Sequence, residues 1–368
     1  MKAAKLILVG GFLGAGKTTL LCETARLMKQ RGLIAGLVTN DQAPELVDTA
    51  FLKHDEAKVA EVNGSCFCCN FNGMIEAMEN LKKEAEIDII IAEPVGSCTD
   101  LSATIIQPLK HMLQRDLVVS PLTVMADPLR LANILNGGHA GLNPKTAYIL
   151  KKQLEESDII LISKADTLTP GELNQLKEKA AIRFPDAEIK SVSSVTGEGI
   201  EEWIMEVLSR NDSGNHLAEV DYDIYAEGEA LMGWLNCTIE LSGLEADWNK
   251  FARQFLSKLS RKLDHMNASV GHVKLILESG RGFITGNLTG SGETINFRNQ
   301  AENDPHATLT LNARVEMNPE ILETLVKEAF QSMVTNDITY QFKTLRSLSP
   351  GRPVPIFRFD HVVAGKKK

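Results

Sequence analysis

The sequence predicts an α/β fold, a mostly parallel, doubly wound sheet with helices on both faces, followed by a smaller α+β domain. Three observations predict it. Short apolar runs alternate with amphipathic helical stretches through the first half of the 368 residues. A glycine-rich segment, Gly11 to Thr18, stands between the first apolar run and the first helical stretch. In the second half, apolar and polar residues alternate, which is typical of strands with one solvated face.

The first half contains strands and helices in alternation. A strand buried on both faces is a continuous apolar run, whereas a helix repeats its apolar residues every three or four positions. On these criteria we expect strands at residues 6–9, 33–39, 59–62, 88–92, 121–126, 158–162 and 188–192. We expect helices at residues 17–31, 74–81, 144–155, 172–183 and 200–208. Residues 1–208 are therefore predicted to form the first domain.

The composition changes at residues 209–230, which are rich in acidic side chains and are predicted to be a linker. The second domain is expected at 231–361 and a solvated tail at 362–368. Its predicted strands cover 234–241, 273–277 and 308–315, and one apolar stripe predicts a helix from Trp248 to Leu263. Asn318 and Pro319 have the residue types that begin a helix, an N-cap followed by proline.

Charge and composition exclude several classes of protein. The formal net charge is -9, which argues against a nucleic-acid binder that relies on phosphate contacts. No run of about 18 apolar residues is present, so no membrane span is expected. The N-terminal residues lead directly into the glycine-rich segment, so we expect no cleavable signal peptide. Six cysteines in such a chain indicate a reducing, cytoplasmic compartment, in which clustered thiols bind metals or react.

The segment Gly11 to Thr18 fits the P-loop pattern, with a strand before it and a helix after it. Its glycines allow backbone N–H groups to surround phosphate oxygens, and the helix N-terminus adds a positive dipole end. Lys17 is expected to neutralise the β- and γ-phosphates, and Thr18 to hold Mg²⁺. The predicted phosphate-binding residues are Gly11, Gly14, Ala15, Gly16, Lys17, Thr18 and Thr19.

Two later segments favour GTP over ATP. Ser163-Lys164-Ala165-Asp166 follows a predicted strand and is similar to the Asn-Lys-x-Asp guanine motif, in which the Asp carboxylate accepts two hydrogen bonds from the base. Ser194 lies in the loop after the next strand, where a backbone contact to the base is expected. Either piece alone is compatible with an ordinary surface turn, but both in order after a P-loop indicate guanine.

Candidate catalytic residues follow two other strands. Glu93 ends an apolar strand at the carboxyl edge of the sheet, where α/β proteins bind ligands. It is expected to position or deprotonate the attacking water, or to bind Mg²⁺ through water, and the Gly96 N–H to contact the γ-phosphate. Asp41 is a second candidate for Mg²⁺ or water. The alternatives are a carboxylate that caps the next segment and an Asx turn.

Cys66, Cys68 and Cys69 provide three thiols within four residues. Thiolates select Zn²⁺, Cu(I) or Co²⁺-like ions over Mg²⁺. In an extended chain Cys69 points away from the other two, so a shared ion requires a turn. The dipole of the following helix is expected to lower the thiol pKa values.

Three ligands leave a fourth coordination position, which favours an exchangeable metal; His54, Glu61 and Asp41 are candidates to fill it. Alternatives are three reduced cysteines on a mobile loop, or redox sensing. Cys22 and Cys237 are expected to be core residues. Cys98 is a candidate to face the nucleotide.

Together these motifs resemble the CobW, HypB and UreG family of metal-delivering P-loop GTPases, and most of all its CobW-like branch. The matching pieces are 10–19, 63–69, 93–96 and 163–166. The resemblance implies a P-loop NTPase domain that hydrolyses GTP slowly with Mg²⁺. It also implies insertion of Zn²⁺ or Co²⁺ into a client protein or into a cofactor pathway such as cobalamin synthesis. A homodimer in the GTP state is expected as well.

This chain departs from the family pattern in places. Ser65 separates the glycine from the first cysteine, Ser163 replaces an asparagine, and the second half lacks a histidine-rich run. These departures concern the metal and the client rather than the GTPase. Three hypotheses follow: a GTP-hydrolysing metallochaperone, a GTPase that remodels a cofactor-loaded partner with structural cysteines, and a non-enzymatic metal or redox sensor.

Overall fold

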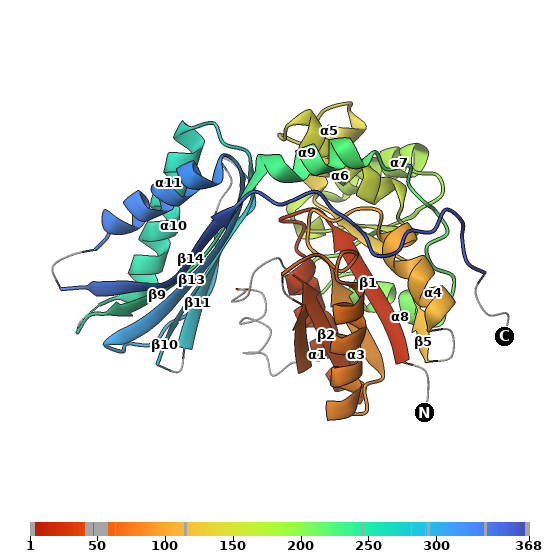
Figure 1. The fold of residues 1–368 in the computed structure, drawn as a ribbon, viewed down its shortest axis with the longest axis horizontal. Coiled ribbons are helices and arrows are strands. Elements are labelled where there is room, and N and C mark those ends of the chain that lie inside the picture. The colour runs from red at the N-terminus through yellow and green to blue at the C-terminus, as the bar shows by residue number, and fades with distance from the viewer. Residues whose placement is uncertain are drawn as a thin grey trace. The chain divides into compact units, whose positions relative to one another are not determined.

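The computed structural model describes residues 4–40, 47, 58–62, 64–113, 116–244, 246–280, 282–290, 292, 295–334 and 337–364. The chain forms two compact units (Figure 1). Unit 1 comprises Met1–Pro44, Leu52–Tyr225 and Pro353–Lys368, and unit 2 comprises Glu45–Phe51 and Ala226–Arg352.

Unit 1 is built on an eight-stranded sheet in the order β3-β2-β4-β1-β6-β7-β8, with β5 paired to β1. All of its strand pairs are parallel. The strands are β1 (Ala4–Gly11), β2 (Ala35–Asn40), β3 (Lys58–Val62), β4 (Ile89–Glu93), β5 (Leu117–Val119), β6 (Thr123–Ala126), β7 (Ile159–Ile162) and β8 (Glu188–Ser191). Because the strands are parallel, their carboxyl ends meet at one edge of the sheet, where ligands bind in such folds.

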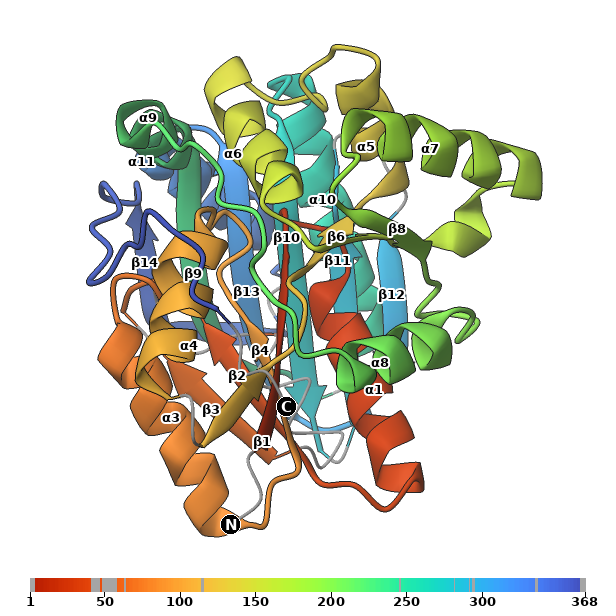
Figure 2. The same ribbon diagram turned by 90° about the vertical axis from the view of Figure 1, so that its right-hand side faces the viewer.

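Helices cover both faces of this sheet, with α1 and α8 on one face and α3 and α4 on the other (Figure 2). The helices are α1 (Lys17–Gln30), α3 (Phe71–Glu84), η1 (Ser102–Ile106), α4 (Gln107–Met112), α5 (Pro128–Leu135), α6 (Pro144–Glu155), η2 (Ala165–Thr167), α7 (Pro170–Arg183), α8 (Ile200–Ser209) and α9 (Tyr222–Leu231). Several begin at side-chain caps, which supply acceptors for free N–H groups. Asn70, Asp127, Asn143 and Thr169 act in this way.

Unit 2 is an antiparallel sheet in the order β12-β11-β10-β13-β9-β14, packed against two helices. Its strands are β9 (Met232–Ser242), β10 (Val270–Ser279), β11 (Gly282–Leu288), β12 (Asn296–Gln300), β13 (His306–Glu316) and β14 (Thr339–Leu348). Its helices are α10 (Trp248–His265) and α11 (Pro319–Gln331). The predicted fold class, a doubly wound parallel α/β domain and then an α+β domain, is confirmed.

The observed structure departs from the predicted domain boundaries in two places. The interval predicted as a linker contains α9, because the Asp221 carboxylate accepts hydrogen bonds from Asp223 N (2.8 Å) and Ile224 N (3.2 Å) and caps the first turn. The last described residues, 353–364, belong to unit 1, whereas the sequence placed most of them in the second domain. Composition reveals neither feature, since an acidic stretch looks like a linker and the place of residues 353–364 depends on contacts distant in sequence.

Candidate functional site

The glycine-rich segment joins β1 to α1 as a tight loop. Gly11, Gly14 and Gly16 have φ values of 128°, 78° and 92°, which residues with a side chain rarely adopt. A Cβ on Gly11 would lie 2.4 Å from the Met125 carbonyl oxygen of β6, so only glycine fits there. Ala15 N donates to Phe12 O at 3.2 Å and closes the turn. The predicted phosphate loop therefore has the tight backbone that phosphate binding requires.

Lys17 and Thr18, which begin α1, meet Glu93 at the end of β4, on the carboxyl edge of the sheet. The Lys17 ammonium donates to Gly11 O at 2.8 Å and lies 3.9 Å from Glu93 Oε1. The Thr18 hydroxyl donates to the Glu93 carboxylate at 3.2–3.3 Å. All three side chains are buried. A hydroxyl and a carboxylate are oxygen donors of the kind that Mg²⁺ takes, directly or through water, so these residues fit that ion.

Gly96 packs directly on the phosphate loop. A Cβ at this position would lie 2.8 Å from Leu13 Cδ2 and 3.1 Å from Lys17 Nζ, so the absence of a side chain at Gly96 allows this close approach. Thr19 lies half-buried on α1. Asp41, the second candidate for the catalytic water, lies outside the described residues.

The residues predicted to recognise the base lie in the loops after β7 and β8. Ala165 N donates to Val192 O at 3.1 Å and joins the two loops. Lys164 adopts φ 52°, and its ammonium pairs with Asp127 Oδ2 at 2.7 Å. The Asp166 side chain is exposed on η2, where a ligand can reach it.

Ser163, which replaces the asparagine of the guanine motif, contacts a neighbouring strand. The Ser163 hydroxyl donates to Ala126 O at 3.2 Å and holds the loop against β6. In the next loop, the Ser193 hydroxyl accepts from Val195 N and Thr196 N, which turns the chain around half-buried Ser194. Sequence reasoning missed Asp127, because its pairing with Lys164 spans 37 positions.

The three clustered thiols converge in a turn before α3. Cys69 N and Asn70 N both donate to Cys66 O, at 3.0 and 2.9 Å, and this turn brings the sulfurs together. The Cys66 Sγ lies 3.0 Å from Cys68 Sγ and 3.2 Å from Cys69 Sγ, and the remaining pair is 3.8 Å apart. Among the described residues, these thiols are the group of His, Cys, Asp or Glu side chains placed to hold one metal ion.

Asn40, at the end of β2, holds this cysteine loop. Its amide nitrogen donates to Val62 O (2.9 Å) and Ser65 O (2.8 Å), and its amide oxygen accepts from Phe67 N at 2.8 Å. The extra residue Ser65 is therefore accommodated by a hydrogen bond to its carbonyl. The neighbouring candidates for a fourth ligand, Asp41 and His54, lie outside the described residues, and Glu61 lies on β3.

The pKa values of the three thiols are shifted in different directions. Hydrogen bonds from Cys68 and Cys69 hold the pKa of Cys66 far below its ordinary value. The hydrogen bond to Cys66 raises the pKa of Cys68, and it raises the pKa of Cys69 to about 11. The expectation that the helix dipole lowers all three pKa values is therefore wrong for Cys68 and Cys69, since mutual hydrogen bonding outweighs the dipole.

Cys98, for which the sequence offers a candidate position facing the nucleotide, lies in the segment after β4. It is buried. Its backbone is fixed from α6, because Gln153 Nε2 donates to Cys98 O at 2.7 Å and to Gly96 O at 3.0 Å.

Glu156 supports the segment that follows Cys98. Its fully buried carboxylate accepts from Thr99 Oγ1 at 3.0 Å and from Ser102 N at 2.9 Å. Burial raises the pKa of Glu156 to about 8, since the charged form loses its hydration. The segment therefore rests on a carboxyl group that titrates near neutral pH.

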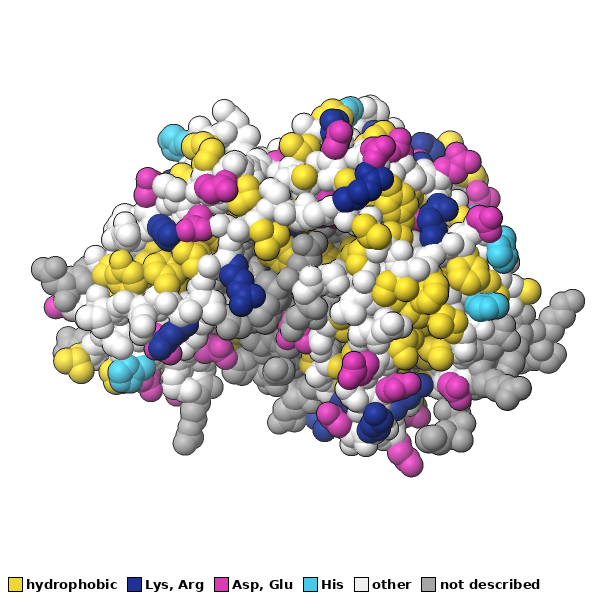
Figure 3. Space-filling view, in the orientation of Figure 1, with side chains coloured by type: hydrophobic (Ala, Val, Ile, Leu, Met, Phe, Trp, Pro, Cys, Tyr) yellow, Lys and Arg dark blue, Asp and Glu magenta, His cyan; other side chains and the backbone are white. Residues whose placement is uncertain are grey.

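The C-terminal residues 353–363, which we call the strap, cross unit 1 beside the cysteine loop (Figure 1). Val354 N donates to Cys69 Sγ at 3.3 Å, and Ile356 N donates to Cys68 O at 2.9 Å. The Phe357 ring meets Phe71 of α3 edge-on at 5.3 Å. Hydrophobic side chains gather on the face of unit 1 that the strap crosses (Figure 3). The strap thus supplies an N–H donor to a thiol sulfur.

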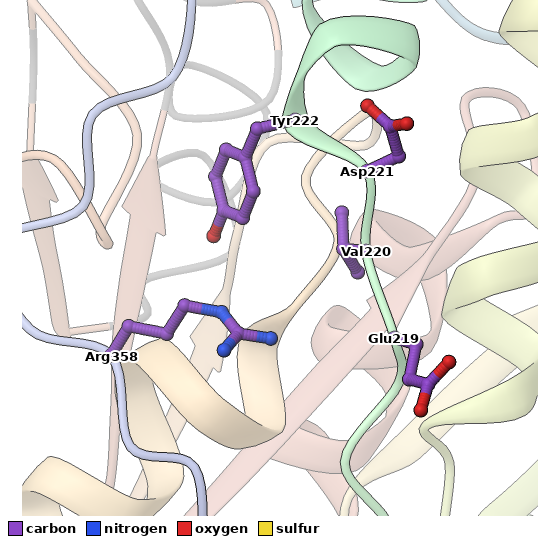
Figure 4. A pocket seen from close by; sticks show the side chains of 5 residues that line it. All are labelled: Glu219, Val220, Asp221, Tyr222 and Arg358. Carbon is purple, nitrogen blue, oxygen red and sulfur yellow. The ribbon is translucent and has the colours of Figure 1, made fainter.

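Arg358 anchors the strap to the segment after Cys98. Its Nε donates to Asp100 Oδ2 at 2.7 Å, and the Tyr222 hydroxyl donates to the same oxygen at 2.7 Å. Arg358 and Tyr222 approach each other across a hollow of about 600 Å³, which Glu219, Val220 and Asp221 also line (Figure 4). This hollow contains none of the predicted site residues, so it belongs to the strap rather than to the nucleotide site.

Comparison with known proteins finds related sequences and structures. Residues 5–190 match the model of the CobW/HypB/UreG nucleotide-binding domain. The zinc chaperone YjiA of Escherichia coli (strain K12) is 23% identical over 250 residues, covering 61% of this chain and 74% of YjiA. The crystal structure of Zn(II)-bound YjiA GTPase from E. coli is 16% identical, covers 91% of this chain and 100% of that chain, and has a TM-score of 0.40. The hydrogenase maturation factor HypB from Archaeoglobus fulgidus is 19% identical, with 56% and 89% coverage and a TM-score of 0.38.

The phosphate loop between β1 and α1, at the edge of a parallel sheet, defines a P-loop nucleotide-binding protein. The match over residues 5–190 spans about half of the chain, and the protein belongs to the CobW/HypB/UreG family. It is therefore a P-loop GTPase, as the sequence predicted. Among the helices that the described residues form, none has the length and hydropathy needed to cross a bilayer.

The buried carboxyl of Glu156 makes stability depend on pH. Its pKa is higher in the folded state than in the unfolded chain, so the stability that it contributes is full below about pH 4.5 and is lost as pH rises toward 8. Relative to Glu156→Gln, the free energy of unfolding of the wild type should fall by up to about 1.4 kcal/mol per pH unit between pH 5 and 8. Urea unfolding in the presence of a chelator measures this difference. Glu178→Gln, on the exposed face of α7, is the control. Parallel pH profiles for the wild type and Glu156→Gln would contradict the assignment.

Proposed function

We propose that this GTPase is a metallochaperone that binds a transition metal ion, Zn²⁺ or Co²⁺, at Cys66, Cys68 and Cys69 and delivers it to a client. The observation that carries the proposal is the convergence of three sulfurs within 4.8 Å of one another in the nucleotide-binding domain. All six cysteines of the chain, each among the described residues, are free thiols, which fits a reducing, cytoplasmic setting.

The nucleotide residues have distinct proposed roles. The backbone N–H groups of the loop from Gly11 to Thr18 surround the phosphates of GTP, and Lys17 transfers its hydrogen bonds from the loop carbonyls to the β- and γ-phosphate oxygens. Mg²⁺, held by Thr18, would neutralise charge that develops on the phosphates. Glu93, already hydrogen-bonded to Thr18, orients or deprotonates the attacking water, and Asp41 remains the second candidate for that role.

Recognition of guanine is assigned to the loops after β7 and β8. The exposed Asp166 carboxylate accepts two N–H groups of the base, a pair of donors that adenine lacks. Lys164 is held by Asp127, so its aliphatic stem is in place to pack on the base. The loop around Ser194 offers a backbone N–H to the base oxygen. These contacts make GTP the substrate and not ATP.

The thiol cluster suits a soft ion that must later leave. Thiolates prefer Zn²⁺ or Co²⁺-like ions to Mg²⁺, so the cargo and the ion at the nucleotide do not compete. The neutral thiols release protons when an ion binds, and this makes binding weaker as pH falls. The cysteine turn is a surface-proximal loop, with Cys69 half-exposed, so an ion can pass to a partner.

Transfer to a client protein or cofactor pathway completes the proposal, and cobalamin synthesis is the example that the family resemblance supplies. A homodimer in the GTP state is the expected assembly. YjiA, to which the chain is similar, is named a zinc chaperone, and this supports zinc as the first metal to test.

Two variants test the nucleotide site. Lys17→Ala should weaken GTP binding about 10- to 100-fold, because charge-assisted hydrogen bonds contribute about 1.5–3 kcal/mol.

Asp166→Ala should lower the preference for GTP over ATP by about tenfold or more while ATP binding stays unchanged. Fluorescent nucleotide titration measures both effects, with Asp186→Ala, an exposed residue after α7, as the control. Unchanged GTP preference in Asp166→Ala would refute the assignment of the base site.

A double variant tests the metal site. Cys68→Ser with Cys69→Ser should abolish stoichiometric binding of Zn²⁺ and Co²⁺, because a hydroxyl is a poor ligand for these ions, and should leave GTP binding intact. Metal titration against a chromophoric chelator gives the affinity. Cys237→Ser, a buried thiol of β9 in unit 2, is the matched control. Full metal affinity in the double variant would remove the basis of the proposed function.

A further inference from the structure

The strap contacts the cysteine turn through backbone N–H groups. Val354 N donates to Cys69 Sγ at 3.3 Å, and Ile356 N donates to Cys68 O at 2.9 Å. The side chains of the two donor residues are 70% and 46% exposed, so neither is deeply buried. The contact therefore rests on two hydrogen bonds rather than on the burial of these side chains.

The sequence of the strap suits such a one-sided contact. Pro353 and Pro355 alternate with Val354 and Ile356. A residue that precedes proline is biased toward an extended conformation, and in an extended chain every second N–H group lies on the same side. Proline itself has no N–H group. Residues 353–356 therefore present their N–H groups toward the cysteine turn and have none at the alternate positions.

The cysteine turn is held from two directions. Asn40, buried at the end of β2, binds the backbone of Ser65 and Phe67 in the first part of the turn. The strap binds Cys68 and Cys69 in the second part. Hydrogen bonds of exposed backbone open at a lower free energy than those of a buried core. The strap is therefore the side from which the turn is released.

We propose that the strap retains the metal ion: the Val354 N–H donates to the Cys69 thiolate while the ion is bound, and the ion leaves when residues 353–356 lift from the cysteine turn. The inference rests on the proposed function, since it adds a retaining element to the same site. Hydrogen bonds to metal ligands fix their orientation, and loss of such a partner weakens metal binding by about 10- to 100-fold.

Contacts further along the strap keep it attached when residues 353–356 lift. Arg358 Nε donates to the fully buried Asp100 carboxylate at 2.7 Å. The Phe357 ring packs edge-on against Phe71 of α3 at 5.3 Å. The segment that covers Cys69 thus continues directly into an anchored segment, and it returns to the cysteine turn after the ion has left.

Hydrogen exchange of the full-length wild type, followed by mass spectrometry with overlapping peptides, tests the proposal without a substitution. Because proline has no N–H, exchange within residues 353–356 reports the Val354 and Ile356 amides alone. If the strap stabilises the bound ion, the ion must stabilise the strap by the same factor. We expect these amides to exchange about tenfold or more slowly when Zn²⁺ is loaded under reducing conditions. Equal exchange with and without Zn²⁺ would overturn the proposal.

Two substitutions at one exposed position isolate the N–H group. Val354→Pro removes the donor, and Pro355 already favours the extended backbone that proline accepts. This variant should bind Zn²⁺ about tenfold or more weakly and release it correspondingly faster to an excess of chromophoric chelator. Val354→Ala keeps the N–H and should behave as the wild type. Wild-type affinity and release in Val354→Pro, or an equal loss in Val354→Ala, would contradict the assignment.

The spectrum of bound Co²⁺ separates a direct hydrogen bond from a purely structural role of the strap. A thiolate that loses its hydrogen-bond donor gives up an electron more easily, so the sulfur-to-cobalt charge-transfer band of Val354→Pro should move to longer wavelength than that of Val354→Ala. Retained binding of a GTP analogue shows that Val354→Pro is folded. Identical bands in the two variants would show that the N–H does not act on the ligand.

The double variant Cys68→Ser with Cys69→Ser, measured in parallel, separates this inference from the proposed function. If the double variant loses Zn²⁺ while Val354→Pro behaves as the wild type, the inference fails and the metallochaperone proposal stands. If the double variant binds Zn²⁺ as the wild type does, the proposed function fails, and the inference fails with it.

Discussion

The hydrogen bond from the Thr18 hydroxyl to the Glu93 carboxylate joins two segments that are 75 positions apart, and the rest of the site depends on it. It places the phosphate loop against the end of β4 and so sets the path of the chain through Gly96 to Cys98. A parallel sheet makes this contact possible, because the carboxyl ends of β1 and β4 are neighbours. The segment that runs from Glu93 to Cys98 therefore lies beside the phosphate loop.

Much of the site could be predicted because its parts are contiguous in sequence. The phosphate loop is eight adjacent residues between a strand and a helix. The thiols of Cys66, Cys68 and Cys69 lie within one turn. The doubly wound sheet follows from continuous apolar runs such as Ile89 to Ala92. The GTPase class follows from two further loops in the expected order after the P-loop.

The remainder depends on contacts that no local pattern reveals. Val354 donates to a cysteine sulfur 285 positions away, and Asn40 holds the cysteine turn from another strand. Helix α9 was predicted as linker, since its acidic residues lack a continuous apolar stripe and its cap, Asp221, has many other roles in loops.

Coupling between GTP and the metal is tested most directly by the affinity for Zn²⁺ in two nucleotide states. We expect the zinc affinity of the wild type to differ by about tenfold or more between GDP and a non-hydrolysable GTP analogue. Zinc should then change the relative affinity for the two nucleotides by the same factor. Equal zinc affinity in both states would contradict it.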